Sequence, residues 1–337
     1  MRPDNDIAED ANSATETSVA FCAVAIGRNE GDRLRICLDS LSNASALVYV
    51  DSGSTDGSVK LARDQGVETM DLDMSVPFTA ARARNSGFAR LRALNPHLRY
   101  VQFIDGDCEL VPGWTEKAAS FLESNPDIAA VCGRLRERYP DRSVYNWLCD
   151  REWNGPVGDI KACAGNVMMS AQAFESVGGY RDDVVAGEES ELCIRLRRAN
   201  WRIWRLDTEM AFHDAAMTKF SQWWRRVERG GYAYARGASL HGVAPERHWL
   251  WEKRRALIWG LCLPVICAFL SIFAPWGWLS WMLYPAQILR LGIRLEGPRK
   301  DRLLLAFFFV LGRFPESWGV LKFTRDQLLA RVVERHG

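Results

Sequence analysis

The chain has 337 residues, of which 48% are hydrophobic and 25% are charged, so it can bury a substantial core in one large or two ordinary domains. Its formal net charge of +1 lacks the basic excess typical of nucleic-acid-binding proteins, and we expect no nucleic-acid partner. The nine cysteines form no Cys-x-x-Cys pair, which favours reduced, buried thiols in a cytosolic domain over a disulfide framework or a zinc site.

Residues 1–18 are polar and lean acidic, and no apolar run follows a basic start. We interpret them as a disordered leader and not as a signal peptide. Export by cleavage of this segment is therefore not expected.

Residues 19–104 alternate between short apolar, β-branched runs and stretches with helical spacing. Strands are predicted at 19–26, 46–50, 67–70 and 100–104, and helices at 34–41, 58–65 and within 79–94. This alternation predicts an α/β fold with a mostly parallel sheet. In open sheets of this kind ligands bind at the carboxyl ends of the strands, and polar loops follow the first, second and fourth strands here.

Two carboxylates, Asp105 and Asp107, follow the apolar strand that ends near residue 104. Mg²⁺ and Mn²⁺ prefer oxygen ligands and commonly bind one or two protein carboxylates together with substrate phosphates. An isolated Asp-x-Asp can also be a solvated turn, but its place after a buried strand favours a metal site. A further acid, Asp51, ends an earlier strand.

A third acidic cluster, Glu188, Glu189 and Glu191, precedes a helix that is predicted to end near residue 199. Glu188 or Glu189 could act as a general base that takes the proton of an attacking hydroxyl group. Glu191 is expected to face solvent and only to compensate the helix dipole.

Six short motifs, taken in chain order, resemble those of family 2 glycosyltransferases with the GT-A (Rossmann-like) fold. They are Asn29-Glu30, the run from Asp51 to Gly57, Ala83-Arg84-Asn85-Ser86-Gly87, Asp105-Gly106-Asp107, Gly165-Asn166 and Gly187-Glu188-Glu189. The resemblance covers about residues 19–214, and the ordered set is far more specific than any one motif.

The resemblance implies an inverting hexosyltransferase that uses a nucleoside-diphosphate sugar and a divalent metal, Mn²⁺ or Mg²⁺. It implies that Asp51 contacts the nucleotide base, that Asp107 coordinates the metal, and that Asp105 approaches the ribose or the metal. The other residues implied in the donor pocket are Asn29, Glu30, Arg84 and Asn85. Glu189 would be the base with Glu188 beside it, and Gly165 and Asn166 would lie near the acceptor.

His213 follows an apolar, strand-like stretch. A lone histidine is more often a hydrogen-bonded structural residue. Because similar glycosyltransferases place a metal-binding histidine near this point, the resemblance favours His213 as a third metal ligand.

The sequence departs from the family pattern at two places. The family usually has Glu-Asp where this chain has Glu188-Glu189, so the expected base is one methylene longer. Processive membrane synthases carry Gln-x-x-Arg-Trp, whereas the run here is Gln222-Trp223-Trp224-Arg225-Arg226. The second departure predicts non-processive transfer.

The 34 residues from Ala256 to Leu289 contain no charged side chain, and basic residues flank them on both sides. One helix of that length would span about 50 Å, whereas a hairpin broken at Pro275-Trp276-Gly277 gives two short spans that suit a hydrocarbon core of about 30 Å. Both basic flanks then lie on the same side of the membrane, which is predicted to be cytoplasmic. The alternative is a buried helical subdomain of a soluble protein.

Two more segments bear on the membrane. The apolar run within about 303–320 is too short to cross alone and is interpreted as re-entrant or interfacial. Residues 219–241 mix aromatic and arginine side chains, which suits either a helix that meets anionic headgroups or a lipid diphosphate, or a basic face packed on the core. The predicted division is a leader at 1–18, a GT-A domain at 19–240 and a helical, membrane-associated region at 241–337.

Together these features predict transfer from a UDP- or GDP-linked sugar to a saccharide or lipid-linked acceptor in cell-surface polysaccharide biosynthesis, at the cytoplasmic face of the inner membrane. One alternative is a sugar-nucleotide pyrophosphorylase, but the loop at 28–31 lacks the glycine-rich character that such an enzyme needs. Another alternative is a non-catalytic membrane scaffold that binds nucleotide sugars.

Overall fold

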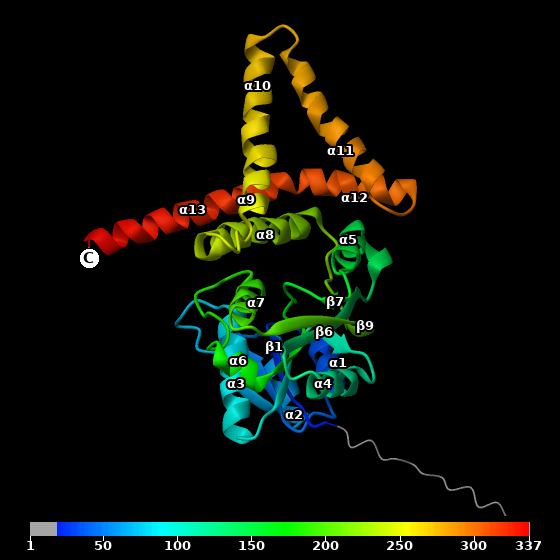
Figure 1. Ribbon diagram of the computed structural model, residues 1–337, viewed down its shortest axis with the longest axis vertical. Helices are drawn as coiled ribbons and strands as arrows, with labels where there is room; N and C mark the ends of the chain where they lie inside the picture. Colours follow the sequence, from blue (N-terminus) through cyan, green and yellow to red (C-terminus); the bar gives the residue numbers. More distant parts are fainter. Residues whose placement is uncertain (1–18, 337) are drawn as a thin grey trace, which may run out of the picture.

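The computed structural model describes residues 19–336, with side chains as far as Ala330, and the predicted leader at 1–18 lies outside the described residues. An α/β domain forms one end of the molecule and a group of long helices forms the other (Figure 1). The α/β class and the C-terminal helices were both predicted from the sequence.

One sheet runs through the α/β domain in the order β3-β2-β1-β4-β8-β6-β9-β5, with β7 paired to β9. The strands are β1 (Cys22–Gly27), β2 (Leu47–Asp51), β3 (Glu68–Asp71), β4 (Tyr100–Asp105), β5 (Cys108–Leu110), β6 (Ile128–Glu137), β7 (Gly158–Asp159), β8 (Val167–Ser170) and β9 (Arg202–His213). Strands β3, β2, β1 and β4 are parallel, as predicted. Strand β8 is antiparallel to β4 and β6, and β5 and β7 are antiparallel to β9, so the sheet as a whole is mixed.

Helices alternate with the first strands along the chain, as the apolar spacing predicts. The helices of the domain are α1 (Asp32–Asp39), α2 (Ser58–Asp64), α3 (Ala80–Leu94), α4 (Trp114–Ser124), α5 (Val144–Glu152), α6 (Ala171–Ser176) and α7 (Glu188–Arg198). Gly87 lets α3 lie directly on β1, because a Cβ atom at this position would stand 2.4 Å from Cγ1 of Val24. The central strands are buried on both faces, which matches their nearly continuous apolar sequences.

The strand register positions the acids that the sequence predicts to be functional. Gly27 pairs with Asp51 across β1 and β2, and Ile26 pairs with Asp105 across β1 and β4, so the carboxyl ends of the three strands meet at one edge of the sheet. Cys108 pairs with His213 across β5 and β9, which brings the end of β9 to the same edge.

The C-terminal helices form a crosswise layer and a projecting hairpin (Figure 1). They are α8 (Phe220–His241), α9 (Leu250–Leu257), a π-helical turn (Ile258–Cys262), α10 (Leu263–Phe273), a 3₁₀ segment (Gly277–Met282), α11 (Leu283–Arg294), α12 (Arg299–Leu311) and α13 (Arg313–His336). Helices α8, α12 and α13 lie between the α/β domain and the hairpin of α10 and α11. The chain reverses between α10 and the 3₁₀ segment, at the predicted break.

Two helical stretches are long and apolar enough to cross a membrane, Leu250–Phe273 and Arg299–Ala330. Only 11% of the apolar window in the first stretch is buried, compared with 50% in the second. Ile272, Phe273 and Ile293 on the hairpin are 74%, 69% and 77% exposed. This exposure argues against a buried helical subdomain, since such helices would cover their apolar side chains with protein.

Candidate active site

The candidate active site lies where the loops after β1, β2 and β4 meet the amino end of α7 and the end of β9. Gly106 closes the turn between Asp105 and Asp107, and its amide donates a 2.8 Å hydrogen bond to the carbonyl of Ile26. Asn166 supports the same turn, since its side-chain oxygen accepts a 2.9 Å hydrogen bond from the amide of Asp105. The backbone of the turn that carries the two acids is therefore held in place.

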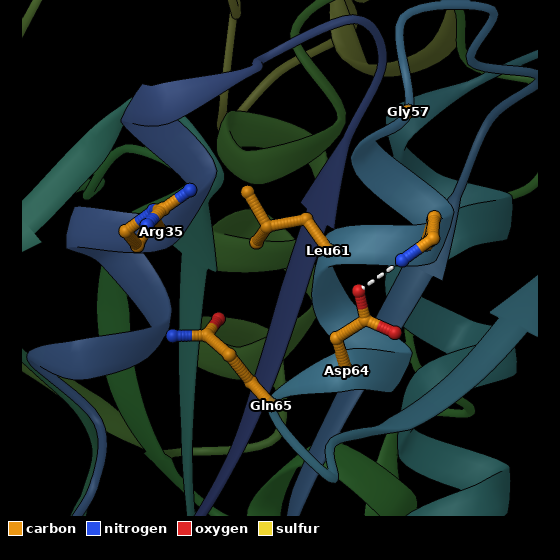
Figure 2. Close-up of a pocket in the computed structure, with 6 residues that line it drawn as sticks. Arg35, Gly57, Leu61, Asp64 and Gln65 are labelled. Atoms are coloured by element: carbon orange, nitrogen blue, oxygen red, sulfur yellow. Dashed lines mark hydrogen bonds and ion pairs between the residues drawn. The ribbon is translucent and has the colours of Figure 1, made fainter.

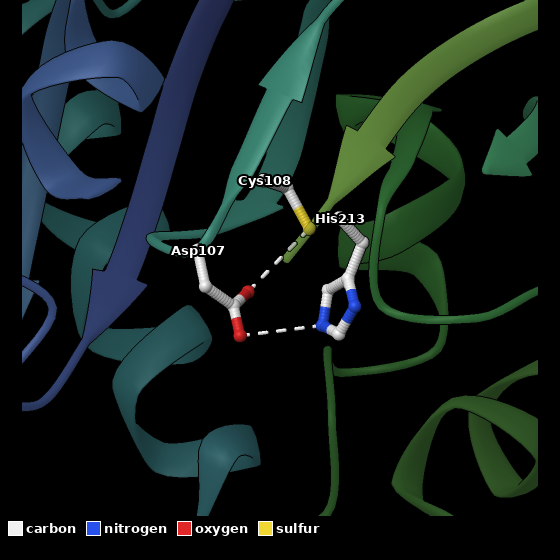
Figure 3. Close-up of side chains that lie close together, drawn as sticks. All are labelled: Asp107, Cys108 and His213. Carbon is white, nitrogen blue, oxygen red and sulfur yellow. Dashed lines mark hydrogen bonds and ion pairs between the residues drawn. The ribbon is translucent and has the colours of Figure 1, made fainter. Parts of the chain in front are cut away.

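Asp107 lies against His213, with 3.2 Å between the carboxylate Oδ2 and the imidazole Nε2 (Figure 3). The thiol of Cys108 donates to Oδ1 of Asp107 at 3.5 Å, and ligand atoms of the three residues all lie within 4.8 Å of one another. Burial alone would lower the pKa of His213, but the carboxylates of Asp107 and Glu137 beside the ring raise this pKa to about 10. Burial would raise the pKa of Asp107, but its hydrogen bond to His213 leaves that pKa below the ordinary value.

These groups fit a divalent cation. A carboxylate and a neutral imidazole are suitable ligands for Mn²⁺, so His213 would give up its proton on binding the cation, and the buried Glu137 lies 3.9 Å from the second ring nitrogen. Cys108 is a poor ligand, because burial and the nearby acids raise the pKa of its thiol well above the usual value and keep it protonated. Asp107 and His213 would thus hold the metal from one side, and substrate oxygens would complete its coordination.

Asp105, which the sequence also suggested as a ligand, lies outside this group and pairs with Arg84. The Arg84 guanidinium is 2% exposed and donates to Oδ1 of Asp105 at 2.8 Å and to Oε1 of Glu188 at 2.9 Å. Gly165 makes room for it, because a Cβ atom there would stand 2.0 Å from Nη2 of Arg84. Arg84, placed in the donor pocket by resemblance, therefore connects the end of β4 to the start of α7.

Glu188 and Glu189 begin α7 but differ in their surroundings. The side chain of Glu188 is 6% exposed and is bonded to Arg84, whereas that of Glu189 is 22% exposed and lies 3.8 Å from the same guanidinium. Burial and the charge of Glu188 raise the pKa of Glu189 to about 7, and Arg84 partly offsets them. Glu189 is thus the carboxylate that remains more open and can exchange a proton near neutral pH.

The prediction that Glu191 faces solvent is wrong. Glu191 is 2% exposed, accepts hydrogen bonds from Arg195 and lies 3.1 Å from Nε2 of His241. The residue faces inward because α8 packs over this side of α7 and supplies His241. Its role is to join the two helices.

The loops after β1 and β2 form the predicted donor side and are tied to each other. Asp51 is 2% exposed and accepts from the amides of Gly53 and Ser54 at 2.9 and 2.7 Å and from the hydroxyl of Tyr49 at 2.8 Å. The side-chain oxygen of Asn29 accepts a 2.7 Å hydrogen bond from the amide of Thr55. The contact of Asp51 with a nucleotide base stays a prediction, since its carboxylate already has three donors.

Two other predicted site residues, Glu30 and Asn85, are also engaged within the protein. Glu30 pairs with Arg33 at 2.6 Å, and burial together with the charge of Asp107 raises the pKa of Glu30. Asn85 donates to the carbonyl of Tyr180 at 2.8 Å and accepts from its amide at 3.0 Å, so it holds the loop that leads to α7. Glu30 lies near Asp107, the acid that could hold a metal, whereas Asn85 faces the loop that leads to α7.

Sequence reasoning missed residues that support the site from a distance in the chain. Glu137 accepts from the amide of Ala215 at 3.1 Å, and Trp153 packs edge-on against His213 with 4.7 Å between ring centroids. Arg33 donates to the carbonyl of Asp214 at 3.1 Å. Only Arg33 had a visible signal, its place three residues after Glu30 at a helix start.

A separate surface pocket of about 360 Å³ lies between α1 and α2 (Figure 2). Its lining includes Arg35, Gly57, Asp64 and Gln65, and none of its lining residues belongs to the acids at the sheet edge. We therefore assign the site to the sheet edge and not to this pocket.

Comparison with known proteins agrees with this assignment. Residues 23–160 match the family model described as "Glycosyl transferase family 2". The "Succinoglycan biosynthesis protein ExoA" of Rhizobium meliloti (strain 1021) is 27% identical over 195 residues, which cover 55% of this chain and 58% of that protein. This chain thus matches less than two thirds of the length of that relative.

A solved structure shares the fold over most of the chain. The mannosyltransferase PcManGT from Pyrobaculum calidifontis, in complex with GDP-Man and Mn²⁺, superposes with a TM-score of 0.62 at 18% identity, covering 92% of this chain and 88% of that one. Residues 23–160 thus match the model of family 2 glycosyltransferases, a curated glycan-biosynthesis protein is similar to about half of the chain, and the solved mannosyltransferase shares the fold.

Proposed function

We propose that this chain transfers one sugar at a time, with inversion, from a nucleoside-diphosphate sugar to a hydroxyl of a saccharide or lipid-linked acceptor in cell-surface polysaccharide biosynthesis. The observation that carries the proposal is the position of Glu189. Its carboxylate, with a pKa of about 7, lies beside Arg84, which is bonded to Asp105 at the turn that also holds Asp107. The proposed base and the turn that carries the proposed metal ligand are thereby connected by one buried side chain, Arg84.

Glu189 supplies the proton acceptor of the proposed reaction. The acceptor hydroxyl loses its proton to Glu189 while its oxygen attacks the anomeric carbon, and the bond from that carbon to the diphosphate oxygen breaks on the opposite face. A single displacement of this kind inverts the configuration at the anomeric carbon. Arg84 holds Glu188 in a hydrogen bond, which leaves Glu189 as the carboxylate that takes the proton.

Asp107 and His213 would hold the divalent cation, which when bound neutralises the charge that develops on the leaving diphosphate. We propose a UDP- or GDP-linked donor and Mn²⁺ or Mg²⁺ for this chain, and the complex of PcManGT with GDP-Man and Mn²⁺ supports a nucleoside-diphosphate sugar and a divalent metal. The tied loops after β1 and β2 would form the wall on the nucleotide side.

The proposed location is the cytoplasmic face of a membrane, with the hairpin of α10 and α11 in the lipid. The exposed apolar side chains of the hairpin support this, because water would solvate them poorly. Basic residues stand at both open ends of the hairpin, Arg254 and Arg255 on one side and Arg290 and Arg294 on the other. This arrangement is typical of cytoplasmic flanks.

Asp107→Ala tests the proposed chemistry. The full chain in detergent is assayed for release of nucleoside diphosphate from a panel of UDP-, GDP- and dTDP-sugars, with and without Mn²⁺. We expect metal-dependent release from one donor class and loss of that release in Asp107→Ala, with an unchanged circular dichroism spectrum. Asp64→Ala removes an exposed acid on α2, 62% exposed at its side chain, and serves as the matched control. Near-normal turnover by Asp107→Ala would refute the metal role.

The same assay separates the alternatives. A non-catalytic scaffold would bind donor and release no nucleoside diphosphate in the presence of Mn²⁺. A pyrophosphorylase would need pyrophosphate or a nucleoside triphosphate as co-substrate, and the family match favours the transferase.

A further inference from the structure

A polar cavity of about 260 Å³ lies where the α/β domain meets the C-terminal helices, and the proposed transfer reaction does not use it. Its walls come from α5, α8, α9 and the junction of α12 with α13. The polar side chains that line it are Glu152, Tyr234, Arg255, Arg313 and Glu316, and the others include the aromatic rings of Trp223, Phe308 and Phe309. Aromatic walls with polar groups gathered among them are characteristic of binding sites.

A second, smaller cavity of about 90 Å³ adjoins the first. Arg255, Phe309 and Arg313 line both cavities, while Trp259, Gln287 and Leu291 of the hairpin line only the second. The two guanidinium groups therefore lie between the polar cavity and the space between the hairpin helices. A ligand that reached them from the hairpin side would have an apolar part next to hairpin side chains.

The charged groups around the cavity are not all paired. Glu152 pairs with Arg226 and Glu316 pairs with Arg313, each at 2.5 Å. Arg255 forms no ion pair or hydrogen bond with any side chain that the structure describes, and its buried Nε has no acceptor. Two guanidinium groups and two carboxylates line the cavity, and of these four groups only Arg255 has no hydrogen-bonded or ion-paired partner among the side chains that the structure describes. A half-buried cation without a counter-ion is unfavourable, so the site is complementary to an added anion.

The position of Arg255 indicates which anion can reach it. Arg255 directly precedes the uncharged stretch from Ala256 to Leu289, so it stands at the base of the exposed hairpin. If the hairpin inserts as proposed, this base lies at the depth of the lipid headgroups, where phosphate is the main anion. Arginine also suits phosphate oxygens better than lysine, because its planar group donates two parallel hydrogen bonds.

We propose that Arg255, assisted by Arg313 and Tyr234, binds the phosphate group of an anionic lipid in the cavity between the α/β domain and the hairpin. This proposal rests on the membrane placement in the proposed function and adds a lipid site to it. The site is separate from the acids at the sheet edge. A bound lipid would contact α8 and α13 as well as the hairpin, and it would hold the α/β domain against the membrane.

The test measures lipid binding and not turnover. The full chain in mild detergent is titrated with phosphatidylglycerol or phosphatidylcholine, and bound lipids are counted by native mass spectrometry. We expect one phosphatidylglycerol to bind in preference to phosphatidylcholine. Arg255→Gln should reduce that preference by about tenfold or more, the effect of losing one charge-assisted hydrogen bond, and Arg255→Lys should restore part of it. Arg290→Gln, which removes one charge from the exposed hairpin flank, is the matched control.

Several outcomes would overturn the proposal. Equal losses in Arg255→Gln and Arg290→Gln would show only general attraction to charge. Full retention of binding in Arg255→Gln would place the lipid elsewhere. Displacement of the lipid by millimolar inorganic phosphate would assign the site to a free anion. Asp107→Ala separates the two proposals, because it should lose turnover and keep the lipid preference.

Discussion

Glu188 and Glu189 are neighbours of identical chemistry, and only their surroundings give them different roles. Arg84 holds Glu188 in a 2.9 Å hydrogen bond, while Glu189 remains more open to an acceptor. Glu189→Gln keeps the shape of the side chain and removes the base, so we expect turnover to fall by about 10²- to 10⁴-fold. Donor affinity, measured by calorimetry with Mn²⁺ present, should be unchanged. The assignment is wrong if Glu188→Gln is the variant that loses its turnover.

The raised pKa of Glu189 also predicts how activity depends on pH. A general base works only when it is unprotonated, and burial with the charge of Glu188 sets this pKa to about 7. Below that pH the protonated form dominates, so kcat/KM should fall about tenfold per pH unit, and above it the rate should level off. The profile is measured by initial rates at low donor concentration. A rate that stays constant from pH 8 down to pH 5 would contradict the role of Glu189.

The sequence could predict these acids only where local pattern decides their position. Asp107 follows a buried strand, and Glu189 lies at the start of a helix. Both features are visible in the spacing of apolar residues. The contact between Asp107 and His213 depends on the pairing of β5 with β9 across about a hundred residues, and no local pattern contains it. Glu191 was misjudged for the same reason, since its partner His241 lies on α8.

At the scale of elements, the C-terminal helices pack against one another through glycines. A Cβ atom at Gly231 of α8 would stand 2.0 Å from the carbonyl oxygen of Glu316, and one at Gly319 of α13 would stand 2.0 Å from that of Glu228. The two helices therefore cross with their backbones in contact. The same kind of contact joins the π-helical turn to α13, where a Cβ atom at Gly260 would lie 1.9 Å from the carbonyl oxygen of Arg313.

Gly231→Ala should push α8 and α13 apart. Overpacking of this kind costs about 1–3 kcal/mol, which lowers the melting temperature of the full chain in detergent. Gly230→Ala is the matched control, because a Cβ atom there has no neighbour within 4 Å. The control should stabilise α8 by up to about 1 kcal/mol through helix propensity. Equal melting temperatures for the two variants would show that the backbone crossing is not essential.

The order of β1 to β4 and α1 to α3 agrees with the sequence to within a few residues, because each element has its own apolar period. The place of α8 could not be predicted in this way. The sequence of this segment fits either an interfacial helix or a helix with a basic face that packs on the core. In the structure, Trp223 of α8 packs against Tyr145 and Phe308. Which neighbour covers an amphipathic helix depends on distant segments, here α5 and α12.

At the scale of the whole molecule, the α/β domain suits water, whereas the hairpin suits the hydrocarbon core of a membrane. The helical residues from Ala256 to Phe273 extend about 27 Å, and the 3₁₀ segment with α11 extends about 30 Å. Both arms therefore match a hydrocarbon core of about 30 Å. The sequence left open whether the hairpin spans the membrane or lies in it, and these lengths favour spanning.

If the hairpin spans, its tip should reach the side of the membrane opposite to the α/β domain. Trp278→Cys places a thiol at the tip, where the native side chain is 55% exposed, and Cys262→Ser removes the cysteine that is exposed in the native chain. Ser75→Cys in an exposed loop of the α/β domain, made in the same background, reports the other side. A maleimide that cannot cross membranes should label Trp278→Cys in intact cells and Ser75→Cys only in inverted vesicles. Labelling of both positions from one side would instead make the hairpin re-entrant, because a tip that returns to its starting face cannot be reached from the other.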